Sequence, residues 1–244
     1  MPRVLIRKLE HFTELSDEEK RMLQDASRNV KVIEAHQDII NEGDKPDDVH
    51  LILDGWALRY KGLLNGDRAI LAFLIPGDIC DLHVALLDQM DHSIAALSRC
   101  RVAFIPLKMM EEVMDEGRER QRNSRGLARA LWWSTLRDEA ILREWLVNLG
   151  QRNADKRLAH FFCEMLLRSK AVGLTDDDSF ELPMTQEELG DATGMTTVHI
   201  SRTLKDLQER GLVTVKGRRV VMDNLDGLMA FADFNPNYLH HKEA

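Results

Sequence analysis

The chain has 244 residues, of which 44% are hydrophobic and 30% charged, as is typical of a folded protein with one large domain or two small ones. Its three cysteines are too few for a disulfide scaffold, so we expect a reducing, cytoplasmic environment. No segment approaches the roughly 20 apolar residues of a membrane span, and the opening apolar run is too short for a signal peptide. The formal net charge of −8 excludes a surface that is positively charged throughout, so binding to nucleic acid would require a local basic patch.

The first half of the chain predicts a short helix followed by a small antiparallel roll. Ser16 and Glu19 form a capping box, which indicates a helix start. Alternating apolar residues separated by glycine turns then predict strands. The expected strands cover 49–53, 56–60, 70–75 and 102–105. A short helix is predicted over 107–116, ending at Gly117.

A helix of about 25 residues is predicted from Asn123 to Asn148, because this segment lacks proline and carries an apolar stripe. The stripe comprises Leu127, Leu131, Ile141, Trp145 and Leu149. Such a stripe either packs on the protein's own roll or meets the same helix of a second copy. Its length and the flanking Trp132 and Trp133 favour the second interpretation, a dimer.

Beyond Gly150 the pattern predicts a helix from Asn153 to about Lys170, a strand at 180–182, two close helices and a hairpin. We interpret the acidic loop 176–178 between them as a solvated linker, because the segment offers no further oxygen ligands at calcium-loop spacing.

A capping box at Thr185 opens a two-turn helix that ends near Ala192. Gly194 turns the chain, and Thr196 caps a second helix whose apolar residues share one face. These inward residues are Ile200, Leu204 and Leu207. Two helices joined by a glycine turn predict a helix-turn-helix, and the basic hairpin after it predicts a wing.

Positive charge is concentrated on this motif. Residues 151–244 together carry a net charge of −3, whereas residues 196–219 hold six basic and two acidic residues, a net charge of +4. The basic residues are Arg202, Lys205, Arg210, Lys216, Arg218 and Arg219. Such an arrangement suits a duplex, since phosphate contacts supply affinity and the first turns of the second helix reach base edges. The alternative is a solvated helical face without nucleic acid.

The order of these elements resembles the CRP/FNR superfamily of bacterial transcription regulators over essentially the whole chain. The most specific matches are Glu42-Gly43-Asp44, Gly55, Pro76-Gly77-Asp78 and the run from Gly194 to Leu204. The resemblance implies an α+β fold with a cyclic-nucleotide-binding-like β-roll at 1–118, a dimerisation helix at 119–150 and a winged helix-turn-helix at 151–244. It also implies a homodimer on a two-fold symmetric operator, with double-stranded DNA, a second copy and RNA polymerase as partners and no membrane.

Arg202 matches the arginine with which many members bind guanine, and Ser201 matches the serine before it in the oxygen-sensing branch. Thr197 and Val198 replace other base-reading residues of the motif, so the half-site sequence does not follow. The candidate DNA-binding residues are Thr185, Thr196, Thr197, Val198, His199, Ser201, Arg202, Lys205, Lys216, Arg218 and Arg219.

The roll lacks the residues with which the family binds cyclic AMP. Leu82 stands at the position of the glutamate, and His92 stands at the position of the arginine that precedes Ser93. The oxygen-sensing branch needs four cysteines for its iron–sulfur cluster, whereas this chain has Cys80, Cys100 and Cys163. Neither group is expected here, and the effector is unknown. The candidate effector pocket consists of Leu82, His83, His92 and Ser93.

Haem is one candidate effector. His83 lies six residues after Gly77, as does a haem-binding histidine in the carbon-monoxide-sensing branch, and Pro2 matches that branch's other ligand. Alternatively, a histidine on this helix can simply hydrogen-bond a carbonyl of the roll, and proline is common after the initiator methionine. The remaining candidates are another small ligand, a redox thiol at Cys80 or Cys100, and no ligand at all. No metal site is assigned beyond the possible haem ligands His83 and Pro2.

Motifs of catalysis do not occur in the sequence. There is no His-x-His of a cupin metal site, no glycine-rich phosphate loop, no nucleophile elbow and no His-Glu-x-x-His. We therefore predict a DNA-binding regulator and not an enzyme. The alternative is a β-roll that binds a small ligand without a transcriptional role.

Overall fold

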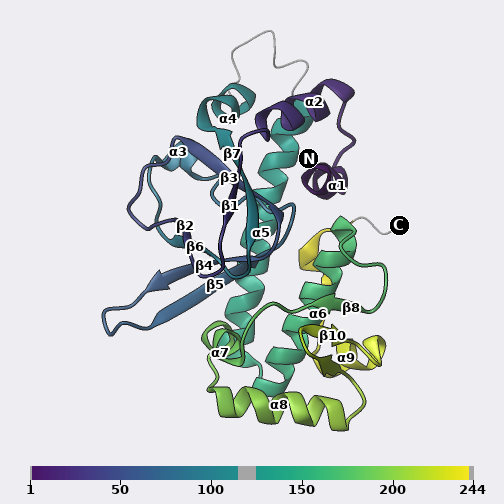
Figure 1. Ribbon diagram of the computed structural model, residues 1–244. Helices are drawn as coiled ribbons and strands as arrows, with labels where there is room; N and C mark the ends of the chain where they lie inside the picture. The colour runs from purple at the N-terminus through teal and green to yellow at the C-terminus, as the bar shows by residue number, and fades with distance from the viewer. Residues whose placement is uncertain (1, 115–124, 242–244) are drawn as a thin grey trace. The chain divides into compact units, whose positions relative to one another are not determined.

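The computed structural model describes residues 2–114 and 125–241. Contacts between residues divide the chain into two compact units, one up to Leu136 and the other from Arg137 to His241. The division falls within one continuous helix, α5 (Arg125–Gln151), which contributes its first part to unit 1 and the rest to unit 2. Figure 1 labels the elements, and each unit is described separately below.

Unit 1 begins with two helices, α1 (Arg3–Glu10) and α2 (Asp17–Ala26). The capping box predicted for α2 is confirmed, since Ser16 Oγ accepts from the Glu19 amide and the Glu19 carboxylate accepts from the Ser16 amide. Helix α1 was not expected from the sequence. It buries Lys8, whose ammonium lies 2.8 Å from the buried carboxylate of Asp78 in the Pro-Gly-Asp turn. Lys8 thus ties α1 to the strands.

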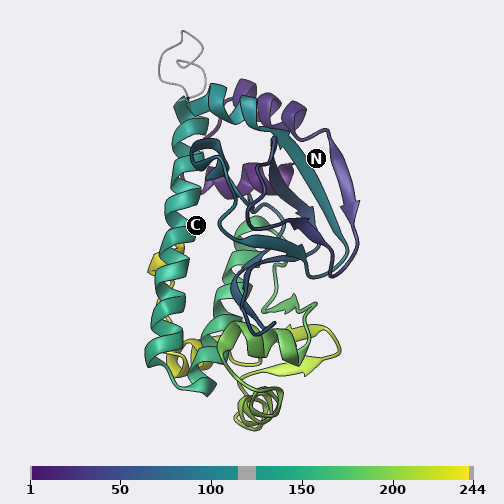
Figure 2. The ribbon, with the colours of Figure 1, turned by 90° about the vertical axis from the view of Figure 1, so that its left-hand side faces the viewer.

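The strands of unit 1 form two antiparallel sheets, ordered β1-β7-β3 and β2-β6-β4-β5 (Figures 1 and 2). They are β1 (Val30–Ile33), β2 (Asp38–Ile40), β3 (Asp48–Asp54), β4 (Ala57–Gly62), β5 (Arg68–Leu74), β6 (Ser93–Ala96) and β7 (Cys100–Pro106). The predicted roll is confirmed, although the short strands β1, β2 and β6 were missed. Gly55 turns the chain between the sheets with φ +80°, where a Cβ atom would lie 2.4 Å from the Arg99 carbonyl.

Two short helices flank the roll, α3 (Val84–Leu87) and α4 (Leu107–Met114). Helix α4 confirms the predicted helix over 107–116 up to the last described residue before the gap. The expected stop at Gly117 and the expected start of the long helix at Asn123 lie outside the described residues.

Helix α5 confirms the long helix, but four of the five residues of its predicted stripe are buried within the folded chain, whereas Leu149 is 44% exposed. Leu127 and Leu131 belong to the hydrophobic core of unit 1, and Trp145 packs edge-on against Phe161 in unit 2. Ile141 is buried as well. These four side chains are core residues of the folded chain, so they are not exposed for the dimer contact that the sequence predicted for them. The periodicity correctly indicated a buried face, but it could not indicate which surface covers that face.

Unit 2 is built around the buried helix α6 (Ala154–Val172), which Asn153 precedes and Gly173 ends in a left-handed conformation. The other elements are β8 (Ser179–Glu181), α7 (Gln186–Thr193), α8 (Thr197–Glu209), β9 (Thr214–Lys216), β10 (Arg219–Val221), α9 (Leu225–Phe231) and a final 3-10 turn (Pro236–Leu239). The strands form a small antiparallel sheet, ordered β8-β10-β9.

The core of unit 2 contains a polar cluster on α6. The carboxylate of Glu164 is fully buried and accepts hydrogen bonds from Trp145 Nε1, Arg168 and the hydroxyl of Tyr238. One turn earlier, His160 is also fully buried, with the Asn148 amide 3.0 Å from Nδ1. The three donors to Glu164 satisfy its carboxylate, which would otherwise be a costly buried charge.

His160 makes the stability of unit 2 depend on pH. Burial lowers the pKa of this imidazole to about 3, although the Glu144 carboxylate lies 3.2 Å from Nε2. Because the folded pKa is below the unfolded one, the neutral ring contributes stability that is complete above about pH 6.5 and lost as the pH falls towards 3. We expect a loss of roughly 2–3 kcal/mol between pH 7 and pH 4.5 from this residue.

Urea unfolding of wild type and His160→Gln at both pH values measures this effect. The variant should be less stable at pH 7 but should lose less stability on acidification than wild type does. Equal losses in the two proteins would contradict the assignment.

Candidate nucleic-acid interface and effector pocket

The predicted helix-turn-helix is confirmed as α7, a glycine turn and α8. Thr185 and Glu188 form a capping box at the start of α7, and Thr196 Oγ1 accepts from the His199 amide at the start of α8. Gly194 ends α7 in a left-handed conformation with φ +65°. At Gly190 a Cβ atom would lie 2.4 Å from the Met195 carbonyl, so only glycine allows this close turn.

Helix α8 has one buried and one exposed face. Ile200, Thr203 and Leu207 are buried against the rest of unit 2. The candidate base-reading residues lie on the exposed face, and Figures 1 and 2 show α8 at the periphery of the unit. They are Thr197, Val198, His199, Ser201, Arg202 and Lys205. Val198 is 59% exposed, which places an apolar side chain among polar ones at the helix start.

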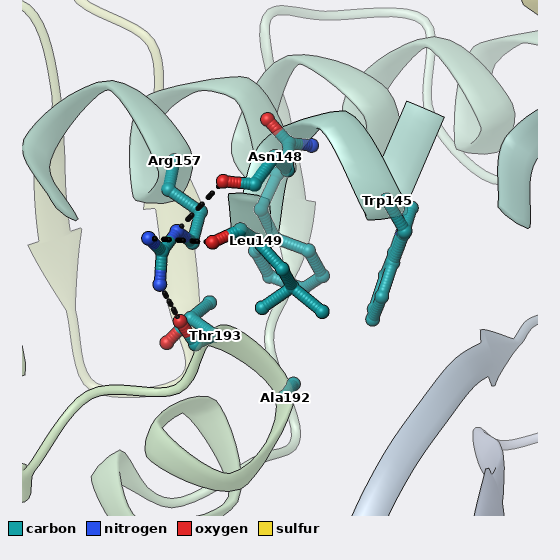
Figure 3. A pocket seen from close by; sticks show the side chains of 7 residues that line it. Trp145, Asn148, Leu149, Arg157, Ala192 and Thr193 are labelled. Carbon is teal, nitrogen blue, oxygen red and sulfur yellow. Dashed lines mark hydrogen bonds between the residues drawn. The ribbon is translucent and has the colours of Figure 1, made fainter. Parts of the chain in front are cut away.

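Arg157 on α6 connects the helix-turn-helix to the end of α5 (Figure 3). Its guanidinium donates hydrogen bonds to the carbonyls of Asn148 (3.0 Å), Arg152 (3.0 Å) and Thr193. It therefore satisfies carbonyl groups at the ends of two helices, α5 and α7. The adjoining cavity has a volume of only about 10 Å³, too small for an effector. Sequence reasoning missed Arg157, because its partners are backbone carbonyls distant along the chain.

The wing is the hairpin of β9 and β10, with Gly217 at φ +61° in its tip. Lys216 and Arg218 are exposed there. Arg219 is also exposed but lies 2.8 Å from the Asp177 carboxylate. Hydrogen bonds from Ser179 and Thr175, together with Arg219, lower the pKa of Asp177 to about 2. The acidic loop is therefore bonded to the wing through Arg219, beside the tip of the hairpin, and is not merely a solvated linker.

Intramolecular ion pairs separate the basic residues of this surface into two groups. Lys205 lies 3.6 Å from Glu209, and Arg210 lies 2.8 Å from Asp206. In the part of the chain that the structure describes, no acidic side chain pairs with Arg202, Lys216 or Arg218. We call these three residues the unpaired cations. They are the positive charges most available to a duplex.

The structure separates the four predicted effector-pocket residues. Leu82 and His83 line a cavity of about 890 Å³ together with Leu86 and Leu87 of α3 and Trp132 of α5. Ser93 does not line this cavity, and its hydroxyl accepts from the Glu42 amide within the roll.

His92 lies beside His83, with ring centroids 5.3 Å apart, and Asp91 lies between the two rings' nitrogen atoms. Sequence reasoning did not single out Asp91, although it directly precedes His92 in the chain.

The redox-thiol alternative receives no support from the geometry. Cys80, Cys100 and Cys163 are all buried and free. Burial raises the pKa of Cys100 to about 11 and that of Cys163 to about 12, and it also raises the pKa of Cys80. These groups therefore remain thiols at neutral pH, whereas reactive cysteines are thiolates.

The haem ligands suggested by the sequence are not brought together. Pro2 is buried at the start of α1, and Figure 1 shows α1 and α3 on opposite sides of the strands of unit 1. Pro2 does not line the cavity that contains His83. The Nε2 atom of His83 is itself buried and lies 3.6 Å from Asp91, so a haem iron could reach it only after rearrangement.

Comparisons with known proteins agree with this architecture. Residues 30–116 match the cyclic nucleotide-binding domain, and residues 156–231 match the Crp-like helix-turn-helix domain. The anaerobic regulatory protein of Haemophilus influenzae is 27% identical over 223 residues, which cover 91% of this chain and 83% of that protein. The fumarate and nitrate reduction regulatory protein of Vibrio cholerae is 27% identical over 218 residues, 89% of this chain and 84% of that protein.

The structure of FixK2 from Bradyrhizobium japonicum matches with a TM-score of 0.72 and 25% identity, covering 83% of this chain and 96% of that one. These relatives are regulators and not enzymes. Among the described residues, no helix combines the length and apolar character that crossing a membrane requires. Both halves of the chain thus match one architecture, and the chain belongs to the CRP/FNR family of DNA-binding transcription regulators.

Proposed function

We propose that this regulator binds a two-fold symmetric operator as a homodimer, with α8 of each copy in the major groove. The observation that carries the proposal is the exposed face of α8, where Arg202 and Ser201 project opposite a fully buried apolar face. An arginine in this position can donate two hydrogen bonds to O6 and N7 of a guanine. Thr197, Val198 and His199 lie one turn earlier and would contact neighbouring bases.

The wing supplies the phosphate contacts in this proposal. Lys216 and Arg218 lie in and beside the tip of the β9–β10 hairpin and have no competing carboxylate among the described residues. Thr185 and Thr196 lie at the starts of α7 and α8, where the helix dipole would favour a phosphate. Lys205 and Arg219 would exchange their acidic partners for phosphate, which costs little for exposed ion pairs.

A second face of α5 supports the dimer. Five exposed apolar side chains, here called the exposed α5 stripe, recur at helical spacing. The stripe comprises Trp132, Leu136, Leu142, Leu146 and Leu149. Leu142, Leu146 and Leu149 follow one another at intervals of four and three residues, as in a coiled-coil seam. A second copy of the same helix would cover these side chains, and the dimer would present two recognition helices to the two half-sites.

The proposed function also includes control of DNA binding by an effector and a location in the cytoplasm. An effector bound in the roll would regulate the DNA affinity, and the cavity beside His83 is the place with room for it. Transcription control further requires contact with RNA polymerase and action in the cytoplasm, where the DNA lies.

Selection from a random duplex library tests this function. The full chain should enrich sites with two inverted half-sites, each containing a guanine, whose centres lie about 10 base pairs or a multiple apart. Enrichment of unrepeated half-sites would contradict the dimer. A failure to enrich any sequence would contradict specific DNA binding and favour a ligand-binding role alone.

A further inference from the structure

Three side chains with metal-binding chemistry converge at the edge of the roll in unit 1. His83 immediately precedes α3, and Asp91 and His92 immediately precede β6. One ring nitrogen of each histidine and one carboxylate oxygen of Asp91 all lie within 4.8 Å of one another. Asp91 Oδ1 is 2.6 Å from His92 Nδ1 and 3.6 Å from His83 Nε2. We call these residues the His83–Asp91–His92 cluster.

Two nitrogen atoms of this cluster have no hydrogen-bond partner. His83 Nε2 and His92 Nε2 are both shielded from solvent and make no hydrogen bond among the residues that the structure describes. A buried polar atom without a partner is costly, and it calls for an explanation such as a bound ion. Of the two, His83 Nε2 lies 3.6 Å from the Asp91 carboxylate, whereas His92 contacts that carboxylate through its other ring nitrogen, Nδ1.

From this geometry we propose that the His83–Asp91–His92 cluster binds a divalent transition-metal ion of the Fe²⁺ to Zn²⁺ group. Two imidazoles and one carboxylate form a ligand set that suits these ions and leaves further coordination positions open. Tetrahedral ligands about 2.1 Å from zinc lie about 3.4 Å apart, close to the present separation of His83 and Asp91. To bind an ion, the 2.6 Å contact between Asp91 and His92 would lengthen and the wider separations, of up to 4.8 Å, would shorten. The 76% exposed side chain of Asp91 has room to move.

The surroundings prepare the histidines for this role. Burial lowers the pKa of both His83 and His92, against the opposing effect of Asp91. The rings are therefore neutral at pH 7, the form in which imidazole binds a metal. The nearby guanidinium of Arg59 opposes a second cation but is held by the carbonyls of Ile79 and Cys80. Asp91 supplies the negative charge that compensates for it.

Metal binding would fix a short segment of the roll. The ligands lie at the two ends of residues 83–92, a stretch that contains α3 and a left-handed turn at Asp88. Leu86 and Leu87 of α3 line the cavity that His83 shares with Trp132. An ion at the cluster would therefore order one wall of this cavity. The proposed metal site is independent of the proposed DNA-binding function, because its metal affinity can be measured in the absence of DNA.

Competition titration of the full chain tests the site. The protein is first treated with EDTA and freed of it, and Zn²⁺ is then added in the presence of a chromogenic chelator. We expect one Zn²⁺ per chain, and with Co²⁺ an absorption band of a nitrogen- and oxygen-ligated ion. His83→Ala and His92→Ala should each lower the affinity at least about 100-fold, beyond the range typical of residues that only support ligands.

Asp91→Asn keeps the test decisive, because this exposed side chain can change without disturbing the core. It should weaken binding at least about tenfold with unchanged circular dichroism. His36→Asn is the matched control, since His36 is exposed, lies outside the cluster and has a positive φ that asparagine tolerates. Lack of Zn²⁺ and Co²⁺ uptake by wild type, or equal affinity in all variants, would overturn the proposal. So would a His83-dependent Soret band with added haem but no Zn²⁺ binding.

Discussion

Replacing Arg202 with alanine is expected to weaken binding to the selected operator by about 1–3 kcal/mol, or roughly 5- to 150-fold, with little change on random DNA. Arg202 lies in the second turn of α8 on its exposed face, and no described acidic side chain pairs with it. A guanidinium free of an ion pair can meet a guanine edge without first losing a partner. Fluorescence anisotropy with operator and scrambled duplexes at one salt concentration measures the difference.

Lys216→Ala and Arg218→Ala provide the contrast. Both residues lie on the wing, so each variant should weaken operator and random DNA alike and reduce the salt slope by roughly one. Arg210→Ala is the matched arginine control, because Arg210 lies at the far end of α8, paired with Asp206 and packed over Phe231. It should leave specificity unchanged. If Arg202→Ala weakened both duplexes equally, α8 would not read bases through this residue.

Local signals in the sequence account for most of the fold. Capping boxes at Ser16 and Thr185 specify helix starts through hydrogen bonds within four residues, so they can be found without knowing the rest of the protein. Helix α1 and the three-residue strand β2 carry no comparable signal. The position of α1 depends on the buried pair between Lys8 and Asp78, which are 70 residues apart in the chain.

The candidate sites were predictable to different degrees. The helix-turn-helix could be identified because the cap of α8, the glycine turn before it and its exposed cations are all local features. The effector pocket could not be predicted in this way, because the Ser93 hydroxyl accepts a hydrogen bond from the Glu42 amide within the roll. Asp91, to which the sequence assigned no role, instead lies between the two histidines. Only the folded roll brings residues 83 and 92 together and shows that their nitrogen atoms lack partners.

Glutamate at both Leu142 and Leu146 is expected to convert the protein from a dimer into a folded monomer. These side chains are 48% and 63% exposed, so the folded chain can accept charges there, whereas two copies would have to bury those charges without partners. Sedimentation at micromolar concentration should change from about twice 28.0 kDa to 28.0 kDa. Operator affinity should fall towards that for random DNA, at least about 1,000-fold.

The matched control is Leu131→Glu on the buried face of the same helix. Leu131 is fully buried in the core of unit 1, so a carboxylate there should unfold the unit and not dissociate an intact dimer. Circular dichroism separates the two outcomes, because the double variant at 142 and 146 should keep the wild-type spectrum and melting behaviour. A wild type that sediments as a monomer yet binds the two-fold operator would refute the proposed dimer. A double variant that stays dimeric would place the interface elsewhere than on the exposed α5 stripe.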